Sequence, residues 1–283
     1  MNRHISYDIQ KKEQLSLQEE AALQALVQAC CLHDSCSLSC SFEPGTSYYL
    51  LYLKEESSCR FISAACVLPY DDTLAECTAF THPDWRRQGY FSALLDCILE
   101  DFCETDLLFP LSNAAQDGLA VLTHLGAEFQ ASEFQMELSL KDAVILKPMQ
   151  TAPGLSLLPG EPDKNKKATS DEAPDQGHLS APDETSTPDG TLLKLVRNDG
   201  LLLGSCRLSP AGSGCLCIHH VEILKPYRKQ GFGSALMLLL LKQLTEKNIS
   251  RLILQVSRDN APALALYKKT GFRITETLSY YLF

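Results

Sequence analysis

The first 140 residues contain apolar positions whose spacing alternates between a helical period and a strand period. Turn-forming residues separate these segments, so each segment is expected to form one element. The predicted elements are a helix at Leu17–Leu32, strands at Tyr48–Lys54, Arg60–Leu68 and Leu74–Phe80, a helix from Gly89 to Cys103, a strand at Leu107–Phe109, a helix at Ala114–Leu125, and strands at Phe129 and Phe134–Leu140.

Residues 191–283 follow the same plan without an opening helix. The predicted elements are strands at Leu192–Val196, Leu201–Leu208 and Cys215–Ile223, a helix at Gly233–Lys247, a strand at Arg251–Val256, a helix at Ala261–Lys269, and strands at Phe272–Thr275 and Leu278–Leu282. Several strands followed by alternating helices and strands are typical of an α/β layer with a mixed sheet.

Between these parts lies a segment with the composition of a linker. Residues 148–190 contain seven of the fourteen prolines, and the run from Pro159 to Pro188 has neither a helical nor a strand period. Such a run buries too little apolar surface to offset the entropy lost on ordering. We therefore predict a domain at 1–140, a flexible linker at 141–190 and a second domain at 191–283.

Charge is distributed unevenly over a chain whose total is −10. Residues 1–140 carry a net charge of −14, residues 141–190 carry −4, and residues 191–283 carry +8. This is not the composition of a nucleic-acid-binding protein. A basic domain beside an acidic one suits a polyanionic ligand and a neighbour that attracts cations, although charge that only keeps two surfaces soluble gives the same distribution.

Composition also bears on location and metals. No apolar run approaches the length of a membrane span, and the N-terminus is polar, so we expect a cytoplasmic protein with no membrane partner. The twelve cysteines are expected to be buried free thiols. The cluster of Cys30, Cys31, His33, Cys36 and Cys40 fits no common zinc spacing, so no metal site is predicted.

Two segments of the chain repeat each other. Residues 86–94 read Arg-Arg-Gln-Gly-Tyr-Phe-Ser-Ala-Leu, and residues 228–236 read Arg-Lys-Gln-Gly-Phe-Gly-Ser-Ala-Leu. Further on, Leu-Gly-Ala at 125–127 stands where Thr-Gly-Phe stands at 270–272. Two diverged copies of one fold explain this agreement.

The second copy of the repeat predicts an anion site. Its strand ends at Ile223, a basic turn follows, and a helix begins at Gly231 or Gly233. Glycines let a ligand approach the backbone, and the first amides of the helix, with the positive end of its dipole, attract a phosphate. It is not a Walker loop, and it is not a dinucleotide fingerprint because its first position, Arg228, is not glycine.

The segment from Leu254 to Phe272 carries a resemblance to a known family. It reads Leu-Gln-Val-Ser-Arg-Asp-Asn-Ala-Pro-Ala-Leu-Ala-Leu-Tyr-Lys-Lys-Thr-Gly-Phe and, with the Arg-x-x-Gly-x-Gly turn, resembles the second half of the GNAT superfamily of acyl-CoA N-acyltransferases. The resemblance covers about seventy residues, from Cys215 onward. It implies an α/β fold of the α+β type, with two GNAT-like domains, each a mixed, mostly antiparallel twisted sheet flanked by helices.

The resemblance also implies acetyl-CoA as the cosubstrate and assigns its contacts. The pantetheine arm is expected to contact the backbone of Val221, Glu222 and Ile223 and the side chain of Asn260. The pyrophosphate is expected to accept from the amides of Arg228, Lys229, Gln230, Gly231, Phe232, Gly233 and Ser234. Tyr267 is expected to be the acid that protonates the departing thiolate. An amine must lose a proton to attack a thioester, and an oxyanion must be stabilised by a backbone donor.

Two residues are candidates for the general base. Strand alternation predicts that Cys217, His219, Val221 and Ile223 share one face, with Glu222 on the other. His219 is the first choice because its pKa suits proton removal near neutral pH, and Glu222 is the second. The alternatives are a half-buried sheet histidine at His219 and a core aromatic at Tyr267.

In the N-terminal copy the corresponding residues have changed. Phe91 replaces the second glycine, Leu122 stands at the position of Tyr267, and Cys77 stands at the position of His219. We therefore expect a non-catalytic copy. The C-terminal copy lacks the opening strand and helices that usually cover the acceptor-binding side of this fold. The N-terminal domain is therefore expected to pack against that side and cover it.

The predicted function is acetyl transfer from acetyl-CoA to a primary amine by direct attack. The acceptor is expected to be a small-molecule amine or a protein N-terminus, as in the ribosomal-protein N-terminal acetyltransferase branch that Tyr280 and Tyr281 resemble weakly. A tandem acyltransferase similar to mycothiol synthase is another enzyme of this type. The alternative from another class is a CoA-binding or interaction module without turnover.

Overall fold

The computed structural model describes residues 6–55, 58–141, 154–160, 190–245, 247 and 249–283. The chain folds into two compact units. The first unit consists of residues 1–132 together with 276–283, and the second unit consists of residues 133–275.

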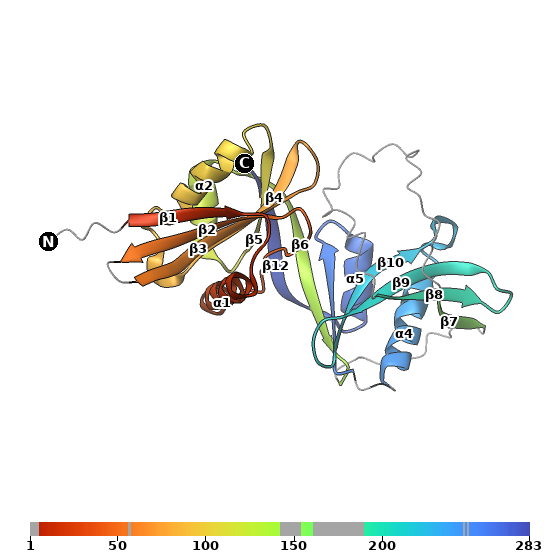
Figure 1. Cartoon of the computed structure of the whole chain (residues 1–283). Coiled ribbons are helices and arrows are strands. Elements are labelled where there is room, and N and C mark those ends of the chain that lie inside the picture. Colours follow the sequence, from red (N-terminus) through yellow and green to blue (C-terminus); the bar gives the residue numbers. More distant parts are fainter. Residues whose placement is uncertain (1–5, 56–57, 142–153, 161–189, 246, 248) are drawn as a thin grey trace. The chain divides into compact units, whose positions relative to one another are not determined.

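The first unit is an antiparallel sheet with one parallel pair and helices on both faces (Figure 1). Its elements are β1 (Ser6–Lys12), α1 (Leu17–Asp34), β2 (Ser47–Glu55), β3 (Ser58–Pro69), β4 (Leu74–Thr81), a 3-10 turn at Pro83–Trp85, α2 (Tyr90–Asp101), β5 (Asp106–Ser112) and α3 (Gln116–Leu125). The strands lie in the order β1-β2-β3-β4-β5, and only β4 and β5 run parallel.

Apolar residues on the two faces of this sheet form separate cores. Helix α1 starts at a capping box in which Ser16 and Glu19 satisfy each other's backbone amides, and it buries Leu23, Leu26 and Cys30 on one face. Helices α2 and α3 bury residues such as Leu94 and Leu122 on the other face. The alternating strands therefore face a core on each side.

The second unit repeats the arrangement. Its elements are part of β6 (Glu128–Ser139), β7 (Leu155–Pro159), β8 (Thr191–Arg197), β9 (Leu202–Pro210), β10 (Cys215–Ile223), a 3-10 turn at Lys225–Tyr227, α4 (Phe232–Thr245), β11 (Arg251–Ser257), α5 (Ala261–Lys269) and part of β12 (Arg273–Leu282). The strand order is β6-β11-β10-β9-β8-β7, and only β10 and β11 run parallel. Helices α4 and α5 pack into a single core with one face of this sheet.

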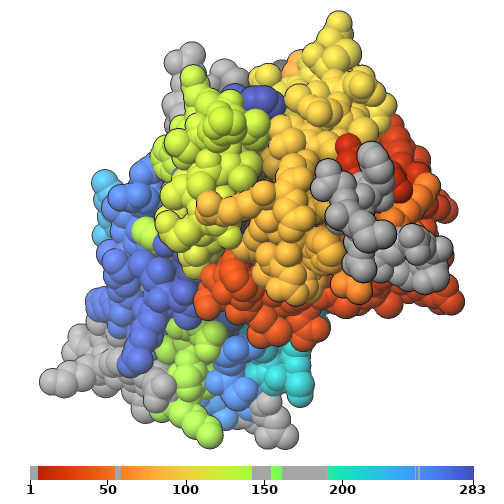
Figure 2. Space-filling view, turned by 90° about the vertical axis from the view of Figure 1, so that its left-hand side faces the viewer, coloured from red at the N-terminus to blue at the C-terminus, as the bar shows by residue number. Residues whose placement is uncertain are grey.

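Two long strands contribute residues to both units. Residues 278–282 of β12, near the end of the chain, pair antiparallel with Leu108–Ser112 of β5 in the first unit. Residues 133–139 of β6 pair with β11 in the second unit. In Figure 2 the dark blue end of the chain shows among the yellow and green segments of the first unit, where the Phe283 amide donates to the carbonyl of Leu107.

The structure confirms the predicted α/β class and differs from the sequence prediction in several elements. Strand β1 was not predicted because its sequence is largely polar, as befits an edge strand. Strand β7 lies inside the predicted linker at 141–190 and gives the second unit the opening strand that it was expected to lack. The rest of that linker, 142–153 and 161–189, lies outside the described residues.

The remaining differences concern strand lengths and boundaries. Two short strands were predicted at the end of each domain. In the structure each of these pairs is one continuous strand, β6 in the first case and β12 in the second. Because these strands are shared, the compact units do not follow the predicted boundaries at 140 and 191. Within the described residues, no helix is long and apolar enough to cross a membrane.

Truncation after Thr275 tests the sharing of β12. Removing residues 276–283 deletes the partner of β5, so the amides of Leu108–Ser112 should exchange with solvent at least about tenfold faster, a loss of ~1.4 kcal/mol of local stability. The amides of β10 and β11 serve as the internal control in the same hydrogen-exchange experiment. Unchanged protection of β5, or a loss confined to the second unit, would contradict the assignment of these residues.

Candidate active site

The central feature of the second unit is a wedge between two parallel strands. Strands β10 and β11 pair over four positions, from Cys215 opposite Arg251 to Ile218 opposite Leu254. Beyond Ile218 the register with β11 ends, although β10 continues to Ile223. On the side toward β11, residues 221–223 therefore have no strand partner, whereas β9 still pairs with Glu222 and Ile223 on the other side.

A β-bulge shapes the end of β10. On β9, Arg207 pairs with His219 and Ser205 pairs with Glu222, so β10 has one residue more than its partner between these pairs. His220 adopts a left-handed conformation with φ of 49°. Gly204 passes so close to this point that an added Cβ would lie 2.3 Å from the carbonyl oxygen of Glu222.

The bulge changes which side chains share a face. Ile218, Val221 and Ile223 all belong to the core beneath α4. His219 and Glu222 instead lie on the opposite face, because their partners Arg207 and Ser205 are two residues apart on β9. The predicted grouping of His219 with Val221 and Ile223 was therefore wrong, since strict alternation does not continue through an extra residue. The two candidate bases lie on one face.

The basic turn after β10 exposes a row of backbone donors. Lys229 and Gly231 have φ angles of 59° and 86°. Arg228 donates from Nε to the carbonyl of Ile223 over 2.8 Å, and Gln230 donates from Nε2 to the carbonyl of Pro226 over 2.9 Å, which fixes the turn. The Arg228 amide, predicted as a pyrophosphate contact, instead donates to the carbonyl of Lys225 over 3.3 Å, because it closes the 3-10 turn; within the described residues, the amides of 229–234 donate to no acceptor. Together with the N-terminus of α4 they form a site for an anion.

Helix α5 begins at a side-chain cap and packs against the start of α4. Asn260 caps α5 by accepting a hydrogen bond from the Ala263 amide over 3.2 Å, so its Nδ2 donors are left for another acceptor. Gly233 lets α4 approach α5, because an added Cβ would lie 3.2 Å from Leu266. Gly233 thus lies close to Leu266 of α5 and, at 3.9 Å from the added Cβ, to Ile223 at the end of β10.

Tyr267 lies in the core of the second unit and is 6% exposed. Burial, and to a smaller extent the Cys206 thiol, raises the pKa of Tyr267 to about 12. Its hydroxyl forms no hydrogen bond with any described residue, and it keeps its proton at neutral pH. A phenol in this state can donate a proton to a ligand atom.

The two candidate bases differ in their surroundings. The Nε2 of His219 lies 2.6 Å from the Ser209 hydroxyl, and its Nδ1 lies 3.9 Å from the Cys217 sulfur. The Glu222 side chain is 58% exposed and has an oxygen 3.9 Å from a guanidinium nitrogen of Arg228. His219 is thus held in place, whereas Glu222 is largely in solvent. Ser209 was not found from the sequence, because the pairing that brings it to His219 is not visible there.

The first unit builds the same turn from its own copy of the repeat. Arg86 donates from Nε to the carbonyl of Thr81 over 3.1 Å, as Arg228 does to Ile223. Arg87 and Gly89 have φ angles of 60° and 85°, which match those of the second unit. The amides of 87–92 likewise donate to no acceptor among the described residues. The repeat therefore extends from the sequence to individual hydrogen bonds.

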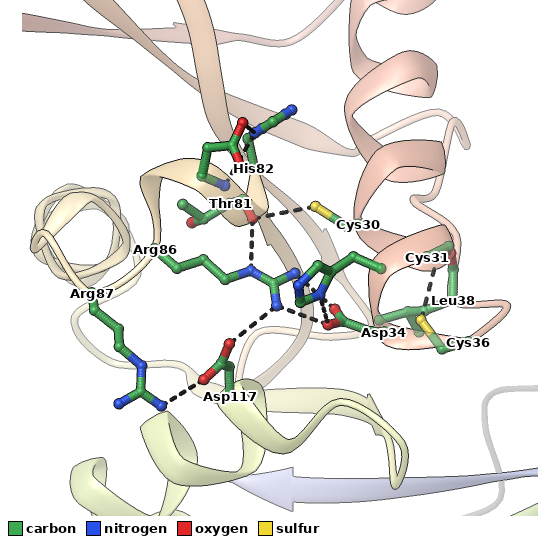
Figure 3. Close-up of polar contacts among 12 residues, drawn as sticks. Cys30, Cys31, Asp34, Cys36, Leu38, Thr81, His82, Arg86, Arg87 and Asp117 are labelled. Carbon is green, nitrogen blue, oxygen red and sulfur yellow. Dashed lines mark hydrogen bonds and ion pairs between the residues drawn. The ribbon is translucent and has the colours of Figure 1, made fainter.

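In this first turn both arginines form ion pairs with carboxylates of the same unit. Arg86 donates to both carboxylate oxygens of Asp34, over 2.8 and 2.7 Å, and reaches Asp117 at 3.4 Å (Figure 3). Arg87 pairs with Asp117 over 2.6 Å. Burial alone raises the pKa of Asp34, but hydrogen bonds from Arg86 and His33 outweigh it, so the pKa lies below its usual value. The cation of the motif is engaged within the protein.

The wedge of the first unit holds a cavity of about 380 Å³ with a mainly apolar lining. Phe91 and Leu122 line it, at the positions that glycine and tyrosine occupy in the second copy. Strand β4 has no bulge, so counting back from the turn places Thr78, and not Cys77, at the position of His219. Thr78 and Cys77 are both buried. These four residues include neither a tyrosine nor a histidine, the residue types found at 267 and 219 in the second unit.

The cysteine cluster lies at the end of α1. The Cys31 thiol donates to the carbonyl of Leu38 over 3.0 Å, and Cys36 lies 3.6 Å from Cys31, sulfur to sulfur. Burial, with a smaller effect of Cys36, raises the pKa of Cys31 to about 12. All twelve cysteines are free thiols. In the described part of the chain, no three His, Cys, Asp or Glu side chains are arranged to hold a metal ion.

Comparison with known protein sequences gives the same family for the second half of the chain. A family model described as "Acetyltransferase (GNAT) family" matches residues 161–272. A mycothiol acetyltransferase of Clavibacter michiganensis is 28% identical over 222 residues, which cover 74% of this chain and 72% of that protein.

Solved structures share the fold over nearly the whole chain. A GCN5-related N-acetyltransferase from Sphaerobacter thermophilus matches with a TM-score of 0.71 and 16% identity, covering 98% of this chain and 95% of that one. A tandem GNAT protein from the clavulanic acid biosynthesis pathway matches with a TM-score of 0.70 and 15% identity, covering 98% of both chains. At these identities the likeness concerns the fold alone.

The different use of the two arginines can be tested by matched substitutions. Arg86→Ala leaves the Asp34 carboxylate, 14% exposed, without its partner, and should lower the free energy of unfolding of the first unit by about 3 kcal/mol. Arg228→Ala removes a half-exposed side chain and should cost the second unit less than about 1 kcal/mol.

Denaturant unfolding of each variant, followed by fluorescence, measures the first effect. Trp85, the single tryptophan, lies next to Arg86 and reports on the first unit. Circular dichroism reports on both units, so the transition that it shows and the Trp85 signal does not is that of the second unit. Equal, small changes in both variants would show that Arg86 does not serve as a structural ion pair.

Proposed function

Because the chain belongs to the GNAT family of acetyltransferases and carries two copies of its fold, we propose that the second unit transfers an acetyl group from acetyl-CoA to a primary amine. The amine attacks the thioester directly, without a covalent enzyme intermediate. The observations that support this proposal are the open amides at 229–234, the buried Tyr267 that keeps its proton and the held His219, all within the second unit.

Binding of acetyl-CoA is assigned to backbone groups of the wedge. The amides of 229–234 and the N-terminus of α4 hold the pyrophosphate, with the charges of Arg228 and Lys229 at the rim. The pantetheine arm lies along 221–223 like an added strand, since β10 has no pair with β11 there and only β9 on its other side. Nδ2 of Asn260 donates to the same arm.

The acid is Tyr267. A thiolate leaves when the new amide forms, and its charge is removed by a proton from the phenol. Because burial holds the pKa of Tyr267 at about 12, the group is protonated throughout the physiological range. Its hydroxyl has no protein partner among the described residues, so hydrogen bonding to a neighbour does not compete with this role.

The base is His219, with Glu222 as the second candidate. A primary amine is protonated at neutral pH and must lose a proton before its lone pair can attack. A neutral imidazole is a base suited to that proton transfer, and the Ser209 hydrogen bond holds the ring of His219. Glu222 lies on the same face but is largely exposed, which makes it the weaker choice.

The first unit is assigned a non-catalytic role. Its turn keeps the geometry of the second, but Leu122 replaces the acid, Thr78 replaces the base, and Ala115 replaces Asn260. Acyl transfer at this wedge would have no group to protonate the thiolate. The acidic composition of the first 140 residues supports a cationic acceptor for the protein as a whole.

The acceptor is assigned only as a primary amine, on a small molecule or at a protein N-terminus. The relative from Clavibacter michiganensis is named for mycothiol, and it supports a small-molecule acceptor without identifying one. A cytoplasmic location and the absence of a bound metal stay predictions.

Tyr267→Phe separates catalysis from binding. Losing the phenolic proton should lower kcat by about 100-fold, the lower end for a general acid, while the affinity for acetyl-CoA changes less than about threefold. Steady-state kinetics on an amine found by screening, with calorimetric binding of acetyl-CoA, measure both. Leu266→Met, on the same helix, is the packing control. Full activity of the phenylalanine variant would remove the acid role, and no turnover in the parent protein with any amine would favour a binding module.

His219→Gln and Glu222→Gln separate the two candidate bases. The glutamine at 219 should lower kcat by about 100-fold at pH 7, whereas the glutamine at 222 should change it less than about threefold. The measurement is the pH profile of kcat for each variant, whose acid limb should disappear only when His219 is replaced. The opposite result would make Glu222 the base.

A further inference from the structure

A serine on the neighbouring strand is bound to the proposed base. The hydrogen bond between Ser209 Oγ and His219 Nε2 is 2.6 Å long, short for a neutral pair. Ser209 pairs with Cys217 in the register and therefore lies diagonally across from His219, on the same face of the sheet. The tautomer sets the direction of this hydrogen bond: when Nε2 carries the proton, the Ser209 oxygen accepts and Nδ1 is the nitrogen that takes up a further proton.

We propose that Ser209 is a positioning residue that holds His219 as the tautomer protonated on Nε2 and stabilises its imidazolium form. This inference rests on the proposed function, in which His219 removes a proton from the amine. When that proton reaches Nδ1, both ring nitrogens carry protons, and the Ser209 oxygen accepts the hydrogen bond from Nε2–H. No bond to Ser209 forms or breaks, and the proton stays on His219 until solvent removes it.

The charges around His219 show why an acceptor at Nε2 matters. Arg207 lies directly opposite His219 on β9, so a cation opposes formation of the imidazolium. Glu222 lies on the same face, while Cys217 contacts Nδ1 and His220 lies next in sequence, with ring centroids 6.4 Å apart. A hydroxyl that accepts from Nε2–H offsets part of the effect of Arg207.

The first unit provides an internal comparison. The position of His219 is occupied there by Thr78, and the position of Ser209 is occupied by Leu68, which pairs with Glu76 as Ser209 pairs with Cys217. The copy without the histidine therefore also lacks the serine. This is expected if the hydroxyl serves the ring and not the sheet.

Nitrogen NMR of the histidine rings tests the proposal without an acceptor substrate. In the ¹⁵N-labelled intact protein, His219→Gln identifies the signals of His219 among the seven histidines. We expect Nε2 to carry the proton in the neutral ring, and Ser209→Ala to lower the pKa of His219 by roughly 0.5–1 and mix the tautomers. Ser209→Thr keeps the hydroxyl and should restore both, and Ser205→Ala, on the same strand and face, should change neither.

Kinetics distinguish failure of this inference from failure of the proposed base. Ser209→Ala should lower the plateau value of kcat about threefold to tenfold and move the acid limb to lower pH, with KM for acetyl-CoA unchanged. An unchanged tautomer and pKa in Ser209→Ala would overturn the positioning role alone if His219→Gln abolishes turnover. If His219→Gln keeps full turnover, the proposed base is wrong and the positioning role falls with it.

Discussion

The divergence of β10 and β11 is the constraint on which the second unit's chemistry depends. Four parallel pairs hold these strands together up to Ile218, and beyond it β10 stays paired with β9 through a bulge but has no pair with β11. Backbone groups on a strand edge without a partner must bond to something else. The turn that follows β10 adds the open amides of 229–234, so this end of the unit offers both an edge for an extended ligand and a site for its phosphates. The close passage of β9 at Gly204 makes room for this bulge.

The two units show that backbone geometry and chemistry are separable. Both turns have the same left-handed residues and the same bond from an arginine Nε to the end of the preceding strand. In the second unit the remaining guanidinium nitrogens of Arg228 lie in a half-exposed setting, whereas those of Arg86 are bound by Asp34 and Asp117. The local sequence of the repeat determines the backbone conformation of the turn. Side chains on other elements determine whether the charge of the turn's arginine is available to a ligand.

What could be predicted from the sequence is what depends on neighbouring residues. The helices, most strands and the glycine turn follow from periodicity and local motifs, and the structure places them as expected. What depends on pairing could not be predicted. Asp34 meets Arg86 across 52 residues, β12 pairs with β5 far along the chain, and the bulge that moves His219 to the other face arises from the register with β9. A polar edge strand such as β1 has no period to detect.

Calorimetric titration of acetyl-CoA into the intact protein tests the central claim most directly, because Gly231 and Gly89 occupy equivalent turns with φ angles of 86° and 85°. Replacing either glycine by alanine strains the same backbone position, so each variant is the control for the other. The account predicts one equivalent bound by the parent protein, lost in Gly231→Ala and retained in Gly89→Ala. One equivalent that is lost in Gly89→Ala, or no binding at all, would contradict it.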